Sequence, residues 1–195
     1  MIVEGIVTTL EPTGCVHLAP MGPLVDSGIQ HLVLRPYRTS QTFANLKAHG
    51  EGVFHVTDDV LLLARAAMGA AEVPALLPAA RVRGFILQDA CRYYEFRVKS
   101  VDDDQERTRL EAEVVSCGRL RDFLGFNRAK HAVVEAAILA TRTAFLPLDD
   151  ILAEYAKLAI IVEKTGGAQE REAFSFLRDR VEQLARSSST ETPAS

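Results

Sequence analysis

Two stretches in the middle of the chain alternate apolar and polar side chains, and they predict a pair of β-strands. The alternation runs through residues 92–101 and again through residues 109–117. A period of two places the apolar side chains on one face of a strand, so the two stretches should form a half-buried antiparallel hairpin. The acidic loop over residues 102–106 would join them as a solvated tip.

β-branched runs bounded by turn signals predict more strands in the first third of the chain. Residues 3–10 and 15–19 form a hairpin, because the turn between them has Pro and Gly where a type I turn prefers them. A third strand stops at Pro36, which cannot sit in a central strand, and a fourth covers residues 52–57. Residues 19–23 hold two prolines and a glycine, so we expect backbone groups free of strand pairing there, in an ordinary loop or against a ligand.

Helical periodicity replaces the strand pattern beyond about residue 126. The segments expected to be helical there are 127–142, 151–164 and 169–186. Two shorter helices, 41–49 and 60–68, are expected among the strands, while residues 69–80 should form an irregular connection. Strands followed by helices indicate an α+β fold. The predicted organisation is a small antiparallel β-barrel over 1–120, a C-terminal helical segment over 121–186 and a disordered polar tail over 187–195.

Composition narrows the classes of function. The 195 residues carry a net charge of −4 without a basic stripe, which argues against a dedicated nucleic-acid binder. No apolar run is long enough to span a membrane and no secretory signal pattern is seen, so we expect a cytoplasmic protein without a membrane partner. The three cysteines are widely spaced and the histidines lack metal-ligand spacing, so neither a disulfide framework nor a metal site is expected.

The corner between the third strand and the first helix carries the best candidate binding site. Arg35 and Arg38 flank Pro36, and hydroxyl side chains follow at the start of the helix. A helix N-terminus attracts anions, and arginines add charge-assisted hydrogen bonds to a phosphate. The side chains predicted to hold the phosphate are Arg35, Tyr37, Arg38, Ser40 and Thr42, with Asn45 as a further contact. A capped surface helix with two solvated arginines is the alternative interpretation.

Three segments in this order resemble the flavin-reductase-like FMN-binding split barrels. They are His17-x-Ala19-Pro20-Met21-Gly22, the corner with its helix up to Leu46, and residues 50–59. The later stretch from Gly125 to Arg142 is similar to that of one uncharacterised branch, domain-of-unknown-function family 447, in which a helical segment follows the barrel. The first resemblance spans about residues 1–120, and the second extends it over nearly the whole chain.

The resemblance implies FMN as the cofactor and a homodimer with the flavin near the subunit interface. Carried over to this chain, it implies that the corner clamps the FMN phosphate. The backbone that would face the flavin ring belongs to Ala19, Pro20, Met21 and Gly22. The occurrence of the family beside methanopterin-linked one-carbon metabolism hints at a pathway.

A second constellation lies on the helix predicted from residue 127. Arg128, His131, Glu135 and Arg142 recur at helical spacing and share one face. A histidine and a glutamate four residues apart, flanked by arginines, could orient a general acid or bind an anionic substrate. Arg128, His131 and Glu135 are therefore the candidate catalytic residues. The alternative is an ion-paired helix face, in solvent or at a dimer contact.

Two functions from different classes follow from these sites. In the first, the protein is an FMN-dependent oxidoreductase that acts on a small anionic metabolite, with the face of Arg128, His131 and Glu135 near the flavin ring. FMN would supply the redox chemistry, and the protein would supply orientation and electrostatics. In the second, the protein is a flavin carrier, a sensor or an assembly partner in a cofactor pathway, without turnover of its own.

Overall fold

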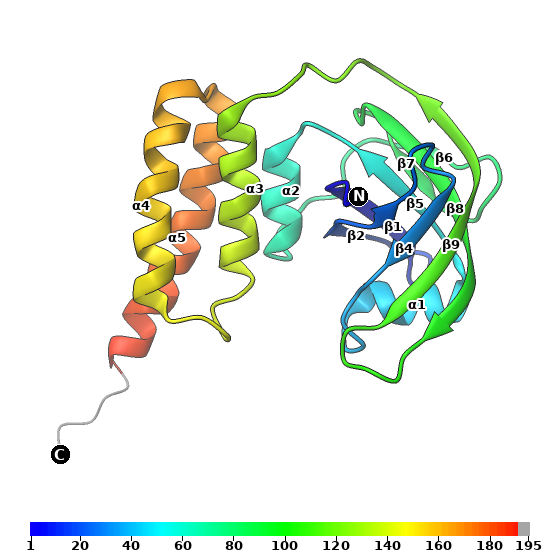
Figure 1. The fold of residues 1–195 in the computed structure, drawn as a ribbon, viewed down its shortest axis with the longest axis horizontal. Helices are drawn as coiled ribbons and strands as arrows, with labels where there is room; N and C mark the ends of the chain where they lie inside the picture. Colours follow the sequence, from blue (N-terminus) through cyan, green and yellow to red (C-terminus); the bar gives the residue numbers. More distant parts are fainter. Residues whose placement is uncertain (191–195) are drawn as a thin grey trace. The chain divides into compact units, whose positions relative to one another are not determined.

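The chain divides into two compact units in the computed structural model, which describes residues 1–190, with side chains through residue 186. The barrel unit comprises Met1–Asp58 and Glu72–Phe123. The helical unit comprises Asp59–Ala71 and the chain from Leu124 onward. Figure 1 shows the strands of the first unit and the long helices of the second.

The barrel unit is built on one seven-stranded sheet in which all neighbouring strands are antiparallel. In spatial order the strands are β2 (Val16–Met21), β1 (Gly5–Leu10), β5 (Glu51–Val56), β8 (Arg92–Asp102), β9 (Arg109–Arg119), β4 (His31–Leu34) and β3 (Leu24–Val25).

Backbone hydrogen bonds near the N-terminus close this sheet into a barrel. The Val3 N–H donates to the carbonyl of Pro23 at 3.2 Å, and the Val25 N–H donates to the carbonyl of Met1 at 2.8 Å. The residues before β1 thus pair with β3, while β2 remains at the other edge of β1. The predicted α+β fold, an antiparallel split barrel followed by helices, is confirmed.

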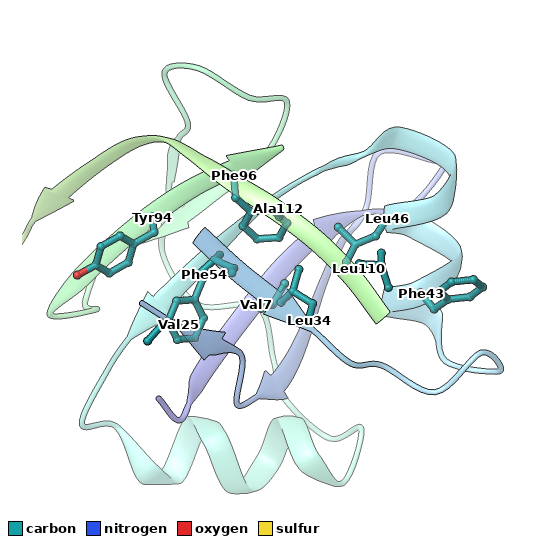
Figure 2. Close-up of a cluster of buried hydrophobic side chains, with 11 residues drawn as sticks. Val7, Val25, Leu34, Phe43, Leu46, Phe54, Tyr94, Phe96, Leu110 and Ala112 are labelled. Atoms are coloured by element: carbon teal, nitrogen blue, oxygen red, sulfur yellow. The ribbon is translucent and has the colours of Figure 1, made fainter. Parts of the chain in front are cut away.

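The interior of the barrel is filled by side chains that the alternating pattern identifies. Figure 2 shows Phe54, Tyr94 and Phe96 reaching into one cluster from neighbouring strands, and Leu110 from β9 joins them. The rings of Phe54 and Tyr94 stack with their centroids 6.2 Å apart. Burying each such side chain contributes about 1.5–3 kcal/mol, which makes this cluster the main source of barrel stability.

A small second sheet covers part of the outer surface of the barrel. It pairs β6 (Leu76–Pro78) with β7 (Phe85–Leu87). The Oγ1 of Thr8 on β1 donates to the carbonyl of Phe85 at 2.7 Å. The expectation of a wholly irregular connection over residues 69–80 was therefore wrong for residues 76–78.

The first helix of the barrel unit, α1 (Gln41–His49), has the bounds that its caps predict. The Ser40 Oγ accepts the N–H of Phe43 at 3.2 Å, which satisfies one of the free donors of the first turn. Gly50 ends the helix in the left-handed conformation with φ 64°, where a side chain would be strained.

The helical unit packs four helices side by side (Figure 1): α2 (Val60–Ala67), α3 (Arg128–Ala140), α4 (Leu148–Thr165) and α5 (Ala168–Thr190). Small side chains such as Ala132 and Ala136 of α3 are buried and allow close helix contact. The Tyr155 hydroxyl donates to the carbonyl of Ala136 at 2.7 Å, and the Lys130 Nζ lies 3.0 Å from the Glu170 carboxylate.

Two predictions about the C-terminal part need correction or fall outside the structure. Helix α5 continues to Thr190, so the polar tail predicted to begin at residue 187 is helical over its first four residues. The rest of that tail, 191–195, lies outside the described residues. None of the described helices is long and apolar enough to cross a membrane.

Candidate functional site

The corner between β4 and α1 is held in place by the tip of the β8–β9 hairpin. The backbone N–H and the Oγ1 of Thr108 both donate to the carbonyl of Pro36, at 3.0 and 2.7 Å. The Arg38 Nη1 donates to the carbonyl of Asp103 at 3.4 Å, and the Asp103 carboxylate pairs with Lys47 of α1 at 2.6 Å. The hairpin tip, predicted to be simply solvated, therefore supports the corner.

Arg35 is distinguished from Arg38 by what surrounds it. Its Nε is buried and has no hydrogen-bond partner among the described residues. Arg38 is exposed and already donates to the hairpin. Leaving a buried donor unpaired costs about 1–3 kcal/mol, and more for a charged group. An acceptor from outside the chain would remove this cost, so Arg35 is the arginine of the corner that is best suited to an anion.

The start of α1 adds backbone donors to this corner. A turn from the Tyr37 carbonyl to the Ser40 N–H, at 2.9 Å, leads directly into the helix. The Ser40 side chain caps Phe43, while the N–H groups of Gln41 and Thr42 come too early in the helix to have a partner within it. With the positive end of the helix dipole, these donors favour an anion. Tyr37 itself is about half exposed.

Thr42 and Asn45, two of the predicted phosphate contacts, have buried side chains that bond within the protein. The Thr42 Oγ1 lies 3.2 Å from the His17 Nε2 on β2, and the Asn45 Nδ2 donates to the Thr9 Oγ1 on β1 at 2.9 Å. Burial lowers the pKa of His17, which favours the neutral ring in this contact. These side chains position α1 against the sheet, and their contact with a ligand stays a prediction.

The backbone predicted to face a flavin ring lies along an edge strand. Pro20 and Met21 pair with β1, so the expectation that residues 19–23 are free of strand pairing was wrong for this part. A strand at a sheet edge still presents unpaired groups on its outer side, and proline is tolerated there. At Gly22 a Cβ would come within 2.8 Å of both carboxylate oxygens of Glu4, so a larger residue there would require the Glu4 side chain to move.

The predicted catalytic side chains Arg128, His131 and Glu135 lie on α3 of the helical unit and are all exposed. None of them has an ion-pair partner within the part of the chain that the structure describes. Ion pairing of this face within one chain is therefore not seen among the described residues, while ion pairing at a dimer contact stays a prediction. Arg142 lies beyond the end of α3. Sequence reasoning missed Phe126, whose ring meets the His131 ring edge-on with centroids 6.0 Å apart.

Two family models match the chain. One is the N-terminal domain of DUF447, a protein family of unknown function, over residues 3–121. The other is described as DUF447, a protein of unknown function, and matches residues 127–179. The chain belongs to the DUF447 family. The predicted resemblance is thereby confirmed.

Solved structures with the same fold include another member of this family, an FMN-bound protein from Methanosarcina mazei. It is 21% identical with a TM-score of 0.77, and the match covers 92% of this chain and 94% of that one. The styrene monooxygenase flavin reductase of Pseudomonas putida is 16% identical, with a TM-score of 0.50 over 60% of this chain and 79% of that one. Nitrilotriacetate monooxygenase component B of Bacillus cereus is 16% identical, with a TM-score of 0.52 over 61% and 70%.

These structural matches show that DUF447 shares the flavin-reductase-like fold. Comparison with curated proteins gave no match.

Proposed function

We propose that this DUF447 protein binds FMN and holds its phosphate at the corner between β4 and α1. The observation that carries the proposal is the buried Nε of Arg35, which has no partner among the described residues. A second support is the Methanosarcina mazei relative, which is FMN-bound and matches this chain over nearly its whole length.

The donors present at the corner fit a phosphate. Arg35 would supply a charged N–H, and the first turn of α1 would supply backbone N–H groups beside Ser40. Tyr37 and Arg38 are exposed at the same corner and would contribute from its rim. The edge strand β2, from Ala19 to Gly22, would present backbone groups to the flavin ring.

We further propose an oxidoreductase that acts on a small anionic metabolite, in the methanopterin-linked one-carbon metabolism that the resemblance suggests. FMN, when bound, supplies the redox chemistry. In this proposal Arg128 binds the anionic group of the substrate, while His131 and Glu135 hold or release a proton. We also propose a cytoplasmic homodimer with the flavin near the subunit interface, as the resemblance implies.

Reduction kinetics separate this enzyme from a flavin carrier. An oxidoreductase loaded with FMN should be reduced by NADH, NADPH or another donor faster than free FMN, whereas a carrier should show no rate above free FMN.

The phosphate assignment is tested by comparing two arginine variants. We expect Arg35→Gln to weaken FMN binding by about 10- to 100-fold, because a hydrogen bond to a charged group contributes about 1.5–3 kcal/mol. Binding of riboflavin, which lacks the phosphate, should barely change in this variant. The matched control is Arg38→Gln, which we expect to cost less than about fivefold because Arg38 is exposed.

The measurement is a calorimetric titration of the flavin-stripped protein with FMN and with riboflavin, preceded by a visible spectrum of the purified protein. Equal affinity of the unaltered protein for the two flavins would contradict the phosphate site. A colourless protein that binds neither flavin would contradict the proposed function as a whole.

A further inference from the structure

The segment leading into α3 exposes aromatic surface to solvent. Phe126 is 93% exposed, more than any other large apolar side chain among the described residues, and Leu124 beside it is 82% exposed. Apolar side chains gathered on a surface in this way are typical of an interaction site. The nearby charges indicate what kind of molecule would cover this one.

The ring of Phe126 lies against a neighbouring ring. Its ring lies at 85° to that of His131, with centroids 6.0 Å apart, which is the preferred edge-to-face arrangement. A T-shaped pair uses the face of only one of its two rings, so open ring faces remain for a third planar group. His131 is exposed as well, and a small molecule can reach both rings.

One cation beside these rings is available to a ligand. Arg128 is exposed and has no ion-pair partner among the described side chains. Lys130, by contrast, already pairs with Glu170 at 3.0 Å. A purely apolar partner covering Phe126 would bury the Arg128 charge without compensation, which is costly. The combination therefore favours a ligand that has both a flat ring and a negative charge.

We propose that Phe126, His131 and Arg128 form a binding corner for a planar aromatic anion. The ring of the ligand stacks on the Phe126–His131 pair, and its anionic group pairs with the Arg128 guanidinium. Glu135 lies one helical turn beyond His131 on the same side of α3. This proposal rests on the proposed function, since it names the substrate class of the helix face assigned there.

Benzoate is the probe, and cyclohexanecarboxylate is the matched acid without an aromatic ring. Both are titrated into the full-length protein, with and without FMN, while the ring resonances of 13C-labelled histidine are followed by NMR. We expect benzoate to shift the His131 resonances saturably by its ring current. Cyclohexanecarboxylate should bind about three- to tenfold more weakly, since it cannot make an aromatic pair.

Three variants separate the contributions to this site. Phe126→Leu keeps an apolar side chain and should weaken benzoate about three- to tenfold without changing cyclohexanecarboxylate binding. Arg128→Gln should weaken both acids, by about two- to fivefold for an exposed charge pair. The control is Phe145→Leu, which alters a 75% exposed phenylalanine that has no ring partner among the described residues and should change neither acid.

Several results would overturn this proposal. One is benzoate that leaves the His131 resonances unmoved, and another is Phe126→Leu with undiminished benzoate affinity. A third is a Phe126→Leu protein that sediments as a monomer where the unaltered protein is a dimer, since a second copy would then cover the corner. Because the titration is made without FMN as well, saturable benzoate binding in a protein that ignores FMN would refute the proposed flavin function while leaving the aromatic corner in place.

Discussion

His55 shows how a single buried residue can link three strands and make stability depend on pH. Its Nδ1 lies 3.1 Å from the carbonyl of Ile6 on β1, and its Nε2 accepts the N–H of Leu87 on β7 at 3.0 Å. This pattern requires the neutral ring with the proton on Nδ1. Burial lowers the pKa of His55 to about 4, against an ordinary value of 6.5.

The direction of the pH effect follows from these two pKa values. Well above pH 6.5 the ring is neutral in the folded and unfolded chains, so its bonds contribute fully. As the pH falls from 6.5 toward 4, the unfolded chain takes up the proton first and folding is disfavoured. The loss attributable to His55 should reach about 3 kcal/mol at pH 4.

Urea unfolding of the protein and of His55→Gln at several pH values measures this effect. The variant should be less stable at pH 7.5, because it cannot reproduce both hydrogen bonds. Between pH 6.5 and pH 4 it should lose less stability than the unaltered protein. Parallel stability curves for the two proteins would show that His55 does not cause the acid sensitivity.

Arg35 and Arg38 mark what sequence reasoning could and could not resolve at the level of residues. Their place between a strand and a capped helix follows from local signals, since Pro36 and Ser40 define the corner. Which arginine keeps an unpaired buried nitrogen depends on a hairpin tip 65 residues after Arg38, where the Asp103 carbonyl engages Arg38. No local pattern encodes that contact.

At the level of elements, predictions were correct where the signals lie within the segment and wrong where the structure depends on contacts outside it. Helix α1 was predicted with its full bounds because its caps, Ser40 and Gly50, lie within the segment itself. The continuation of β2 through Pro20 was missed because it depends on pairing with β1 on one side only. The second sheet was missed because its strands are short. Its loop is held from outside by the buried carboxylate of Glu95, whose Oε2 accepts the N–H of Arg81 at 2.6 Å.

Two adjacent aspartates anchor the point where the chain leaves the barrel unit. The Asp58 carboxylate pairs with the Arg121 guanidinium, whose Nε also donates to the carbonyl of Asp89 at 2.7 Å. Asp59 belongs to the helical unit. Its Oδ1 accepts the first-turn N–H of α2 at 2.9 Å and the Gln169 Nε2 of α5 at 3.1 Å. Neighbouring residues thus stabilise different units.

We therefore expect Asp58→Asn and Asp59→Ala to loosen different parts of the molecule. Removing the buried carboxylate charge of Asp58 should cost about 2–3 kcal/mol, less than for a fully buried pair because Arg121 is partly exposed. Removing the cap at Asp59 should cost about 1 kcal/mol. Segment-resolved hydrogen exchange should show faster exchange in β7 and the start of β8 for the first variant, and in α2 for the second.

The assignment of one aspartate to each unit would be refuted if both variants accelerated exchange in the same segments. Glu154→Gln serves as the control, because its exposed pair with Lys157 on α4 should contribute little.

At the scale of the whole molecule, the chain passes between the two units three times. It leaves the barrel after Asp58, returns at Glu72 and leaves again after Phe123. The predicted division had the barrel and the helical segment in succession, with a boundary near residue 120. It did not include the excursion of Asp59–Ala71 into the helical unit. Helix α2 has an apolar face that can be recognised in the sequence, but the partners of that face are α3 and α5, which lie far along the chain.

This connectivity predicts that the barrel sequence alone is a poor folding unit. A chain ended after Phe123 would keep α2 but lose its partner helices, exposing Val60, Leu63 and Ala66, which the full chain buries. Each of the larger side chains that stays in water loses about 1.5–3 kcal/mol of stabilising free energy from burial. We expect the shortened chain to bind a hydrophobic dye and to self-associate, as followed by fluorescence and sedimentation.

The decisive comparison is with the same shortened chain carrying Val60→Ser and Leu63→Gln. If dye binding and self-association come from the exposed apolar face of α2, both should decrease in this variant. The two substitutions make that face polar, so the chain should become monomeric. The barrel core of Phe54, Phe96 and Leu110 is untouched by them. The expectation would be contradicted if the unsubstituted chain of residues 1–123 were monomeric and bound no dye. Helix α2 would then be stable without α3 and α5.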